Sequence, residues 1–160
     1  MKRVAWVVLL FAPAAFAAGG VCELVKPDEA AAILGGPVSS IPVGTLGCSY
    51  GNRARGLRLT VTVMAAGTMA RQTWEGMRSS ASSAKWLAGD ERGMGTAAYA
   101  QLIRRNSESS AGKCGFVAIK GGKLVQMFIS DSAEKEDVAG KKEMLDRFRP
   151  LAHKIVERLP

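Results

Sequence analysis

The stretch CELVKPDEAAAILGGPVSSIPVGTLGCSY, residues 22–50, predicts a short helix held between two cysteines. Pro27 suits the first helical position, because its missing N–H would have no partner there. Asp28 and Glu29 place negative charge at the positive end of the helix dipole. The alanine-rich run that follows favours helix, and Gly35-Gly36-Pro37 ends it.

This helix has about two turns, which is too short to be stable alone in water. We expect a disulfide between Cys22 and Cys48 to tether it to a strand around Ser49 and Tyr50. Closing a loop of this length stabilises a chain by roughly 3–4 kcal/mol in the chain-entropy model. The third cysteine, Cys114, is then a free thiol or a bridge to another chain.

Ten positions of this stretch form the pattern Cys-x-Leu, a Glu-Ala helix ending Leu-Gly-x-Pro-Val, and Cys-x-Tyr. They are Cys22, Leu24, Glu29, Ala30, Leu34, Gly35, Pro37, Val38, Cys48 and Tyr50. The pattern resembles the mature start of a broad group of secreted bacterial proteins and lipoproteins, most of unknown function. Gly89-Asp90-Glu91 and Ala98-Tyr99 look similar to a later motif of that group, with residues 92–97 inserted. The resemblance implies a fold and an exported location, and it implies no active site.

Residues 1–17 have the features of a cleaved signal peptide. A positive start at Lys2 and Arg3 precedes an apolar run, and Ala15-Phe16-Ala17 is a small-x-small cleavage site. The run is shorter than the roughly 20 residues of a membrane span, so a retained anchor is the less favoured alternative. Residues 19–21 lack a lipobox pattern, which disfavours lipidation of Cys22. We expect a periplasmic or secreted protein, cleaved after Ala17, with a single domain over residues 18–160.

Removal of the signal peptide leaves 20 basic residues against 14 acidic ones, a net charge of +6. In an exported chain this charge favours anionic envelope partners, such as lipid head groups or an acidic protein, over nucleic acid. The basic residues are scattered, which is more typical of a solvated surface than of a dedicated site. Peripheral contact with an anionic envelope surface remains a hypothesis.

Two further patterns predict a strand and a helix. Apolar residues alternate from Leu57 to Val63, which indicates a strand with one buried face. A helix is expected next, with Thr68 as its N-cap. Its apolar stripe is Met69, Thr73, Trp74 and Met77.

The clearest hairpin joins Lys113–Lys120 to Lys123–Ser130 through Gly121-Gly122. The two-residue turn predicts that Lys120 pairs with Lys123, Phe116 with Met127, and Cys114 with Ile129. Both faces of the hairpin are apolar, so we expect a central position covered on both sides. A face left open for a partner is the alternative.

The last helix is amphipathic, and Pro150 inside it is expected to kink or break it. With a further strand over residues 97–104, these elements predict an α+β fold. We expect an antiparallel sheet of about four to five strands with three helices packed on it. The predicted order is helix, two strands, helix, three strands, helix.

Residues 86–96 are interpreted as a glycine-rich loop, with Trp86, Asp90, Glu91 and Arg92 as candidate partner-binding residues. In an extended segment the two adjacent carboxylates would face opposite ways and could not work as an acid/base pair.

Cys114 and the single histidine, His153, are the one nucleophilic pair that the composition permits. The hairpin pairing places this thiol among apolar residues, where burial raises its pKa and makes it unreactive. No set of metal ligands, phosphate-binding loop or nucleophile elbow is evident, so we expect no metal, cofactor or catalytic residue.

These patterns favour an exported, non-catalytic binding protein that holds an apolar or anionic ligand or a protein partner. An inhibitor or immunity protein that blocks an envelope enzyme is the second hypothesis. A cysteine-dependent enzyme is the third.

Overall fold

The computed structural model describes residues 20–103, 112–132 and 138–160. The predicted signal peptide and its cleavage site lie outside these residues. The elements in chain order are α1 (Pro27–Leu34), β1 (Ser39–Val43), β2 (Gly47–Asn52), β3 (Leu57–Ala65), a 3₁₀ turn η1 (Gly67–Met69), α2 (Ala70–Ser83), β4 (Leu87–Glu91), β5 (Ala97–Ile103), β6 (Gly112–Lys120), β7 (Lys123–Asp131) and α3 (Val138–Glu157).

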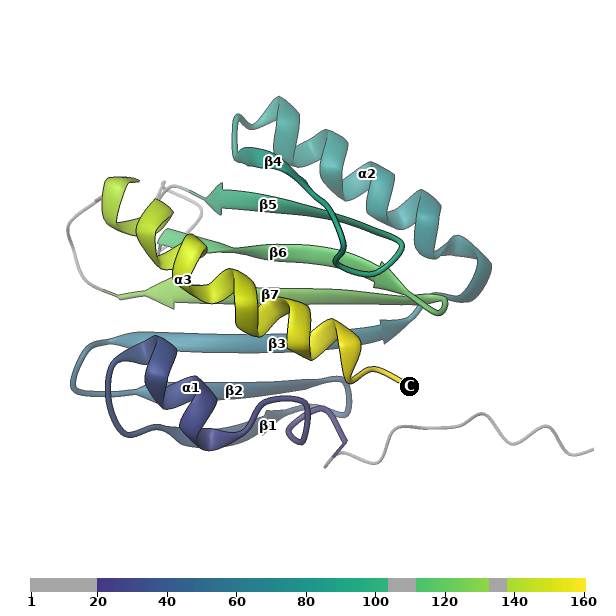
Figure 1. Cartoon of the computed structure of the whole chain (residues 1–160). Coiled ribbons are helices and arrows are strands. Elements are labelled where there is room, and N and C mark those ends of the chain that lie inside the picture. Colours follow the sequence, from purple (N-terminus) through teal and green to yellow (C-terminus); the bar gives the residue numbers. More distant parts are fainter. Residues whose placement is uncertain (1–19, 104–111, 133–137) are drawn as a thin grey trace, which may run out of the picture.

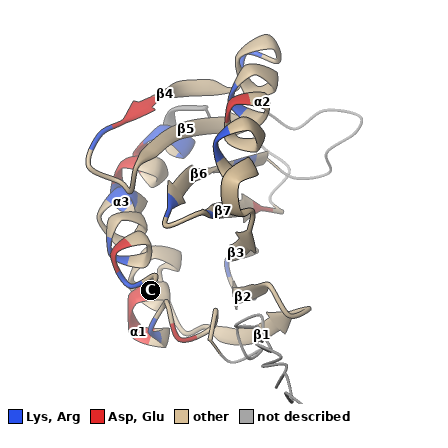
Figure 2. Cartoon of the chain, turned by 90° about the vertical axis from the view of Figure 1, so that its right-hand side faces the viewer, with Lys and Arg blue, Asp and Glu red and all other residues tan. Residues whose placement is uncertain are grey.

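All the described strands belong to one antiparallel sheet, in the order β1-β2-β3-β7-β6-β5-β4 (Figure 1). Helices α1 and α3 cover one face, and α2 covers part of the other (Figure 2). We call the face that α1 and α3 cover the inner face, and the face that carries α2 the outer face. Seven described strands contradict the predicted four to five.

The two strands that the sequence analysis missed, β1 and β4, are the two edges of the sheet. Every residue of β1 is exposed, and the strand contains Pro42. β4 carries Gly89 and two acidic residues, and it occupies part of the segment interpreted as a loop. An edge strand is ordered by pairing with one neighbour, and it needs no apolar alternation. Such strands therefore lack the pattern by which buried strands are recognised.

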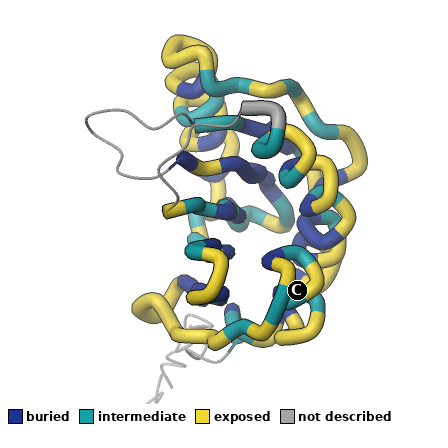
Figure 3. The backbone as a smooth tube through the Cα atoms, turned by 90° about the vertical axis from the view of Figure 1, so that its left-hand side faces the viewer, coloured by how far each residue is buried: buried dark blue, intermediate teal, exposed yellow. Residues whose placement is uncertain are grey.

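The β6–β7 hairpin has the predicted register. Lys120 pairs with Lys123, Phe116 with Met127, and Cys114 with Ile129. Its inner apolar side chains join the larger core beneath α1 and α3, and its outer apolar ones, Val117, Ile119, Leu124 and Phe128, belong to the cluster beneath α2. The prediction of a central hairpin covered on both sides is confirmed, and Figure 3 shows the buried strands between exposed outer surfaces.

The start of α2 differs from the prediction. Thr68 lies in η1, and α2 begins at Ala70 with no side-chain cap. The side chain of Met69 is 60% exposed, so it does not belong to the buried stripe. Thr73 is exposed as well. The buried residues of α2 are Ala70, Trp74 and Ala81.

Helix α3 continues through Pro150 and is not broken there. Phe148, Leu151 and Ala152, on either side of the proline, are buried in the larger core. We attribute the continuity to this packing, which compensates for the backbone hydrogen bond that proline cannot make.

Candidate functional site

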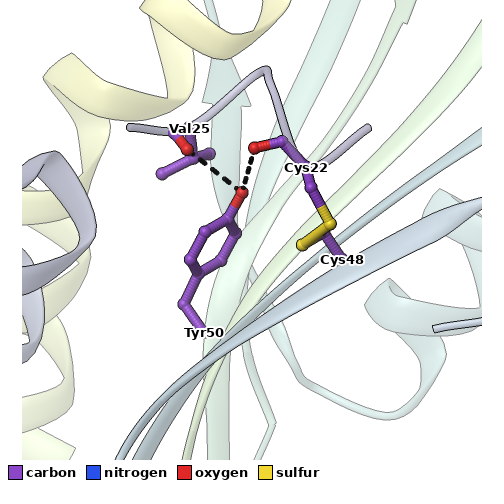
Figure 4. The surroundings of a disulfide bond; sticks show 4 residues. All are labelled: Cys22, Val25, Cys48 and Tyr50. Carbon is purple, nitrogen blue, oxygen red and sulfur yellow. Dashed lines mark hydrogen bonds between the residues drawn. A yellow bond between two sulfur atoms is a disulfide. The ribbon is translucent and has the colours of Figure 1, made fainter. Parts of the chain in front are cut away.

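Cys22 and Cys48 form the predicted disulfide, with their Cα atoms 5.0 Å apart (Figure 4). Cys48 and Tyr50 are two residues apart on β2, so both side chains point to the inner face. The Tyr50 hydroxyl lies 2.7 Å from the carbonyl oxygen of Cys22 and 3.1 Å from that of Val25, and it donates its hydrogen between them. Burial raises the pKa of Tyr50 to about 12. A disulfide in this position is compatible with an oxidising, exported location.

An ion-pair cluster joins α1 to α3. The carboxylate of Glu29 accepts hydrogen bonds from Arg158 at 2.6 and 2.7 Å, and the backbone N–H of Lys26 also donates to it. The Arg158 guanidinium lowers the pKa of Glu29 to about 2. Since Arg158 also donates to the carbonyl of Leu24, this cluster fastens the N-terminal segment to α3.

The four residues proposed as a partner-binding loop do not form one site. Asp90 accepts two hydrogen bonds from Arg78 of α2, and Glu91 accepts hydrogen bonds from Arg149 of α3. The two residues lie on strand β4 and not in the expected loop, and their carboxylates face opposite ways, as expected for an extended segment. Arg92 follows β4 and is exposed.

An apolar groove with a volume of about 450 Å³ lies between α2 and β5. Trp86 is the one candidate from the sequence analysis that lines it. The groove is lined by Thr73, Gly76, Met77, Ser80, Ala81, Trp86, Tyr99, Gln101 and Ile103. We call it the α2–β5 groove.

Backbone geometry fixes the position of Trp86 in this groove. The preceding Lys85 has a φ of 57°, and no other described residue except glycine has a positive φ. This left-handed turn costs roughly 1–2 kcal/mol. The N–H of Trp86 then donates to the carbonyl of Ala81 in α2, and its carbonyl accepts from Leu102 in β5. Trp86 thus bridges the two elements that form the groove.

The floor of the groove comes from β5. Tyr99 and Gln101 are two residues apart, so both face α2. The ring of Tyr99 packs edge-on against Trp74 at a centroid distance of 5.6 Å, and the Trp74 indole donates to the carbonyl of Val117. Burial raises the pKa of Tyr99 to about 12.

Gln101 is the unusual member of this lining. Its side chain is 7% exposed, yet among the described residues its amide has no hydrogen-bond partner. In the described part of the chain, every polar side-chain atom that is fully enclosed has a hydrogen-bond partner. Since the Gln101 amide has none, it is not fully enclosed and opens to the groove that it lines. Most buried amides have partners, because an unpaired one loses its hydrogen bonds to water. This amide can therefore bond a molecule in the groove.

Sequence reasoning missed Tyr99, Gln101 and the role of Met77. The position of Met77 in the apolar stripe of α2 is equally consistent with a core residue and with a residue that lines a groove. The alternation of Tyr99 and Gln101 on one face of β5 was the available signal, but it did not show which helix lies opposite.

Cys114 lies apart from this groove. Burial raises the pKa of its thiol to about 12, in a hollow of about 210 Å³ that Met144 also lines. His153 is nine residues beyond Met144 on α3, roughly 13 Å along the helix axis. A Cys114–His153 pair has no support in this geometry. Among the described residues, no group of three His, Cys, Asp or Glu side chains could hold a metal ion.

Compared with protein-family models, curated proteins and solved structures, the chain matches none. No helix in the described part of the chain is long and apolar enough to span a membrane.

Proposed function

We propose that this chain is an exported, non-catalytic binding protein that holds an amphipathic small molecule in the α2–β5 groove. The observation that carries the proposal is the Gln101 amide, which has no hydrogen-bond partner among the described residues and lies in an otherwise largely apolar groove. A ligand with an apolar body and one polar group matches it. The body would pack on Trp86 and Met77, above the buried ring of Tyr99, and the polar group would bond the amide.

The size of the groove supports a small molecule. Its volume of about 450 Å³ falls within the roughly 300–1,000 Å³ typical of ligand pockets. Binding sites of this class are lined mainly by apolar and aromatic side chains, with a few polar groups that fix orientation. Trp86 and Met77 supply the apolar surface of such a site here, and the Gln101 amide supplies the polar group.

Export is supported by the sequence and by the disulfide. The features of residues 1–17 are those of a signal peptide, and the Cys22–Cys48 bond would persist in an oxidising compartment. We place the mature protein in the periplasm or outside the cell.

The other two hypotheses have less support. An inhibitor that inserts residues 86–96 into an enzyme would need free side chains there, but Asp90 and Glu91 are bound to Arg78 and Arg149. A cysteine-dependent enzyme would need a thiolate, and the raised pKa of Cys114 leaves almost none at neutral pH.

The test is a fluorescence titration with N-phenyl-1-naphthylamine, an apolar probe that carries one N–H donor. We expect saturable binding that Trp86→Ala and Gln101→Leu weaken at least about threefold, since a lost contact or hydrogen bond is worth roughly 1 kcal/mol. Gln126→Leu makes the same substitution on the outer face of β7, away from the groove, and should bind like the parent. Equal binding by all four proteins would place the probe elsewhere and defeat the proposal.

A further inference from the structure

A second hollow, of about 230 Å³, lies on the outer face where β2 turns into β3. The register sets Gly51, Arg58 and Ser130 side by side on β2, β3 and β7, and all three line it. The turn between β2 and β3 adds Arg53 and Gly56, and Ser132 closes the side next to β7. We call it the β2–β3 hollow.

The two arginines of this hollow, Arg53 and Arg58, are exposed, and no described carboxylate neutralises their charge. Within the described ranges, neither the Arg53 nor the Arg58 side chain forms a hydrogen bond or an ion pair. By contrast, four other arginines each bind a carboxylate, namely Arg71, Arg78, Arg149 and Arg158. No aspartate or glutamate is among the residues that line the hollow.

A third arginine of the same turn, Arg55, belongs to a different surface. A side chain added at Gly35 would collide with its guanidinium, so Arg55 lies over the C-terminal end of α1. The negative end of the helix dipole favours a cation there. Arg53 and Arg58 therefore remain as the cations of the hollow.

The backbone acceptors around the hollow are already occupied. The carbonyl of Arg53 accepts from the Gly56 N–H, and the carbonyl of Gly56 accepts from both the N–H and the hydroxyl of Ser132. The carbonyl of Arg58 accepts from the Ser130 hydroxyl. Among the described residues no acceptor bonds the two guanidinium groups, so their N–H donors are free to bind a ligand. The complementary ligand is an oxyanion.

We propose that the β2–β3 hollow binds a phosphate group between the guanidinium groups of Arg53 and Arg58. Each guanidinium presents a planar fork of donors that matches two phosphate oxygens, and a phosphate has enough oxygens to engage both forks at once. The phosphate is either free or carried by a lipid head group. This site is separate from the α2–β5 groove and does not depend on the function proposed for it.

The first test is calorimetric titration with inorganic phosphate at constant ionic strength. We expect Arg58→Gln to weaken binding about fivefold and the Arg53→Gln/Arg58→Gln double variant to abolish it, since one exposed ion pair is worth up to about 1 kcal/mol. Arg92→Gln removes the same charge from an exposed arginine outside the hollow and should bind like the parent. If Arg92→Gln and Arg58→Gln weaken binding equally, the effect is one of net charge and the proposal is overturned.

The second test identifies the source of the phosphate by co-sedimentation with phosphatidylglycerol vesicles, and with phosphatidylcholine vesicles as the neutral comparison. Arg58-dependent binding to inorganic phosphate supports a free phosphate. If binding to phosphatidylglycerol vesicles depends on Arg58 and inorganic phosphate does not bind, the phosphate belongs to a lipid head group. If neither probe binds in an Arg58-dependent way, the proposal fails. Trp86→Ala should leave both measurements unchanged, which separates this site from the α2–β5 groove.

Discussion

Asp90 and Glu91 are neighbours on the edge strand β4, yet they bind arginines on opposite faces of the sheet. Asp90 pairs with Arg78 of α2 at 2.7 Å, and Glu91 pairs with Arg149 of α3 at 3.1 Å. Successive side chains of a strand point to opposite faces, so one dipeptide can connect both helix layers. These pairs hold β4 between the two helix layers.

The two ion pairs should contribute unequally to stability. Glu91 is 13% exposed and Asp90 is 59% exposed. We expect Glu91→Gln to lower the free energy of unfolding by about 1–2 kcal/mol, because a shielded charge pair is weakly screened. Asp90→Asn should cost less than about 1 kcal/mol. Urea unfolding of both variants checks this, and an equal loss in the two would contradict it.

The disulfide should be the main tether of the N-terminal segment. The Cys22→Ser/Cys48→Ser variant is expected to lose about 3–4 kcal/mol of unfolding free energy in the chain-entropy model. Tyr50→Phe, which keeps the ring but loses both carbonyl contacts, should lose only about 1 kcal/mol. Urea unfolding with and without reductant measures each loss. If reduction left the parent as stable as before, the disulfide would not have this role.

Glu29 should make stability depend on acid pH. Its pKa is about 2 in the folded chain, below the ordinary value of 4.5, because Arg158 binds the carboxylate. A depressed folded pKa means that the contribution is complete above about 4.5 and is lost as the pH falls through 2. The stability difference between the parent and Glu29→Gln should therefore shrink between pH 5 and pH 2. A difference that stays constant over this range would exclude the assigned ion pair.

Cys114 should resist alkylation in the folded protein. The thiol is 1% exposed and its pKa is raised to about 12, so both access and thiolate are lacking at pH 8. Intact mass after alkylation should show no label on the native protein and one label after denaturation without reductant. Rapid labelling of the native protein would instead support the bridging or cysteine-dependent hypotheses.

The sequence indicated those features whose signals are local. Pro27 and the glycines after Leu34 bound α1 as predicted, since the fixed φ of proline and the left-handed φ of 72° at Gly35 act within single residues. The Gly121-Gly122 turn fixed the hairpin register for the same reason. By contrast, Thr68 was misread as a cap, because nothing local distinguishes a capping threonine from one in a preceding 3₁₀ turn.

What the sequence determined by itself is therefore the disulfide pair, α1 and the central hairpin. The Gly121-Gly122 turn, the alternation of apolar residues, and the positions of Cys22 and Cys48 on either side of α1 were enough to predict these features. Only the tertiary structure decided the edge strands, the α2–β5 groove and the β2–β3 hollow. Gln101 shows the reason, because its burial at the α2–β5 groove, without a hydrogen-bond partner among the described residues, depends on how α2 packs on the sheet. Likewise, the sequence does not show that no acidic side chain in the described part of the chain pairs with Arg53 or Arg58.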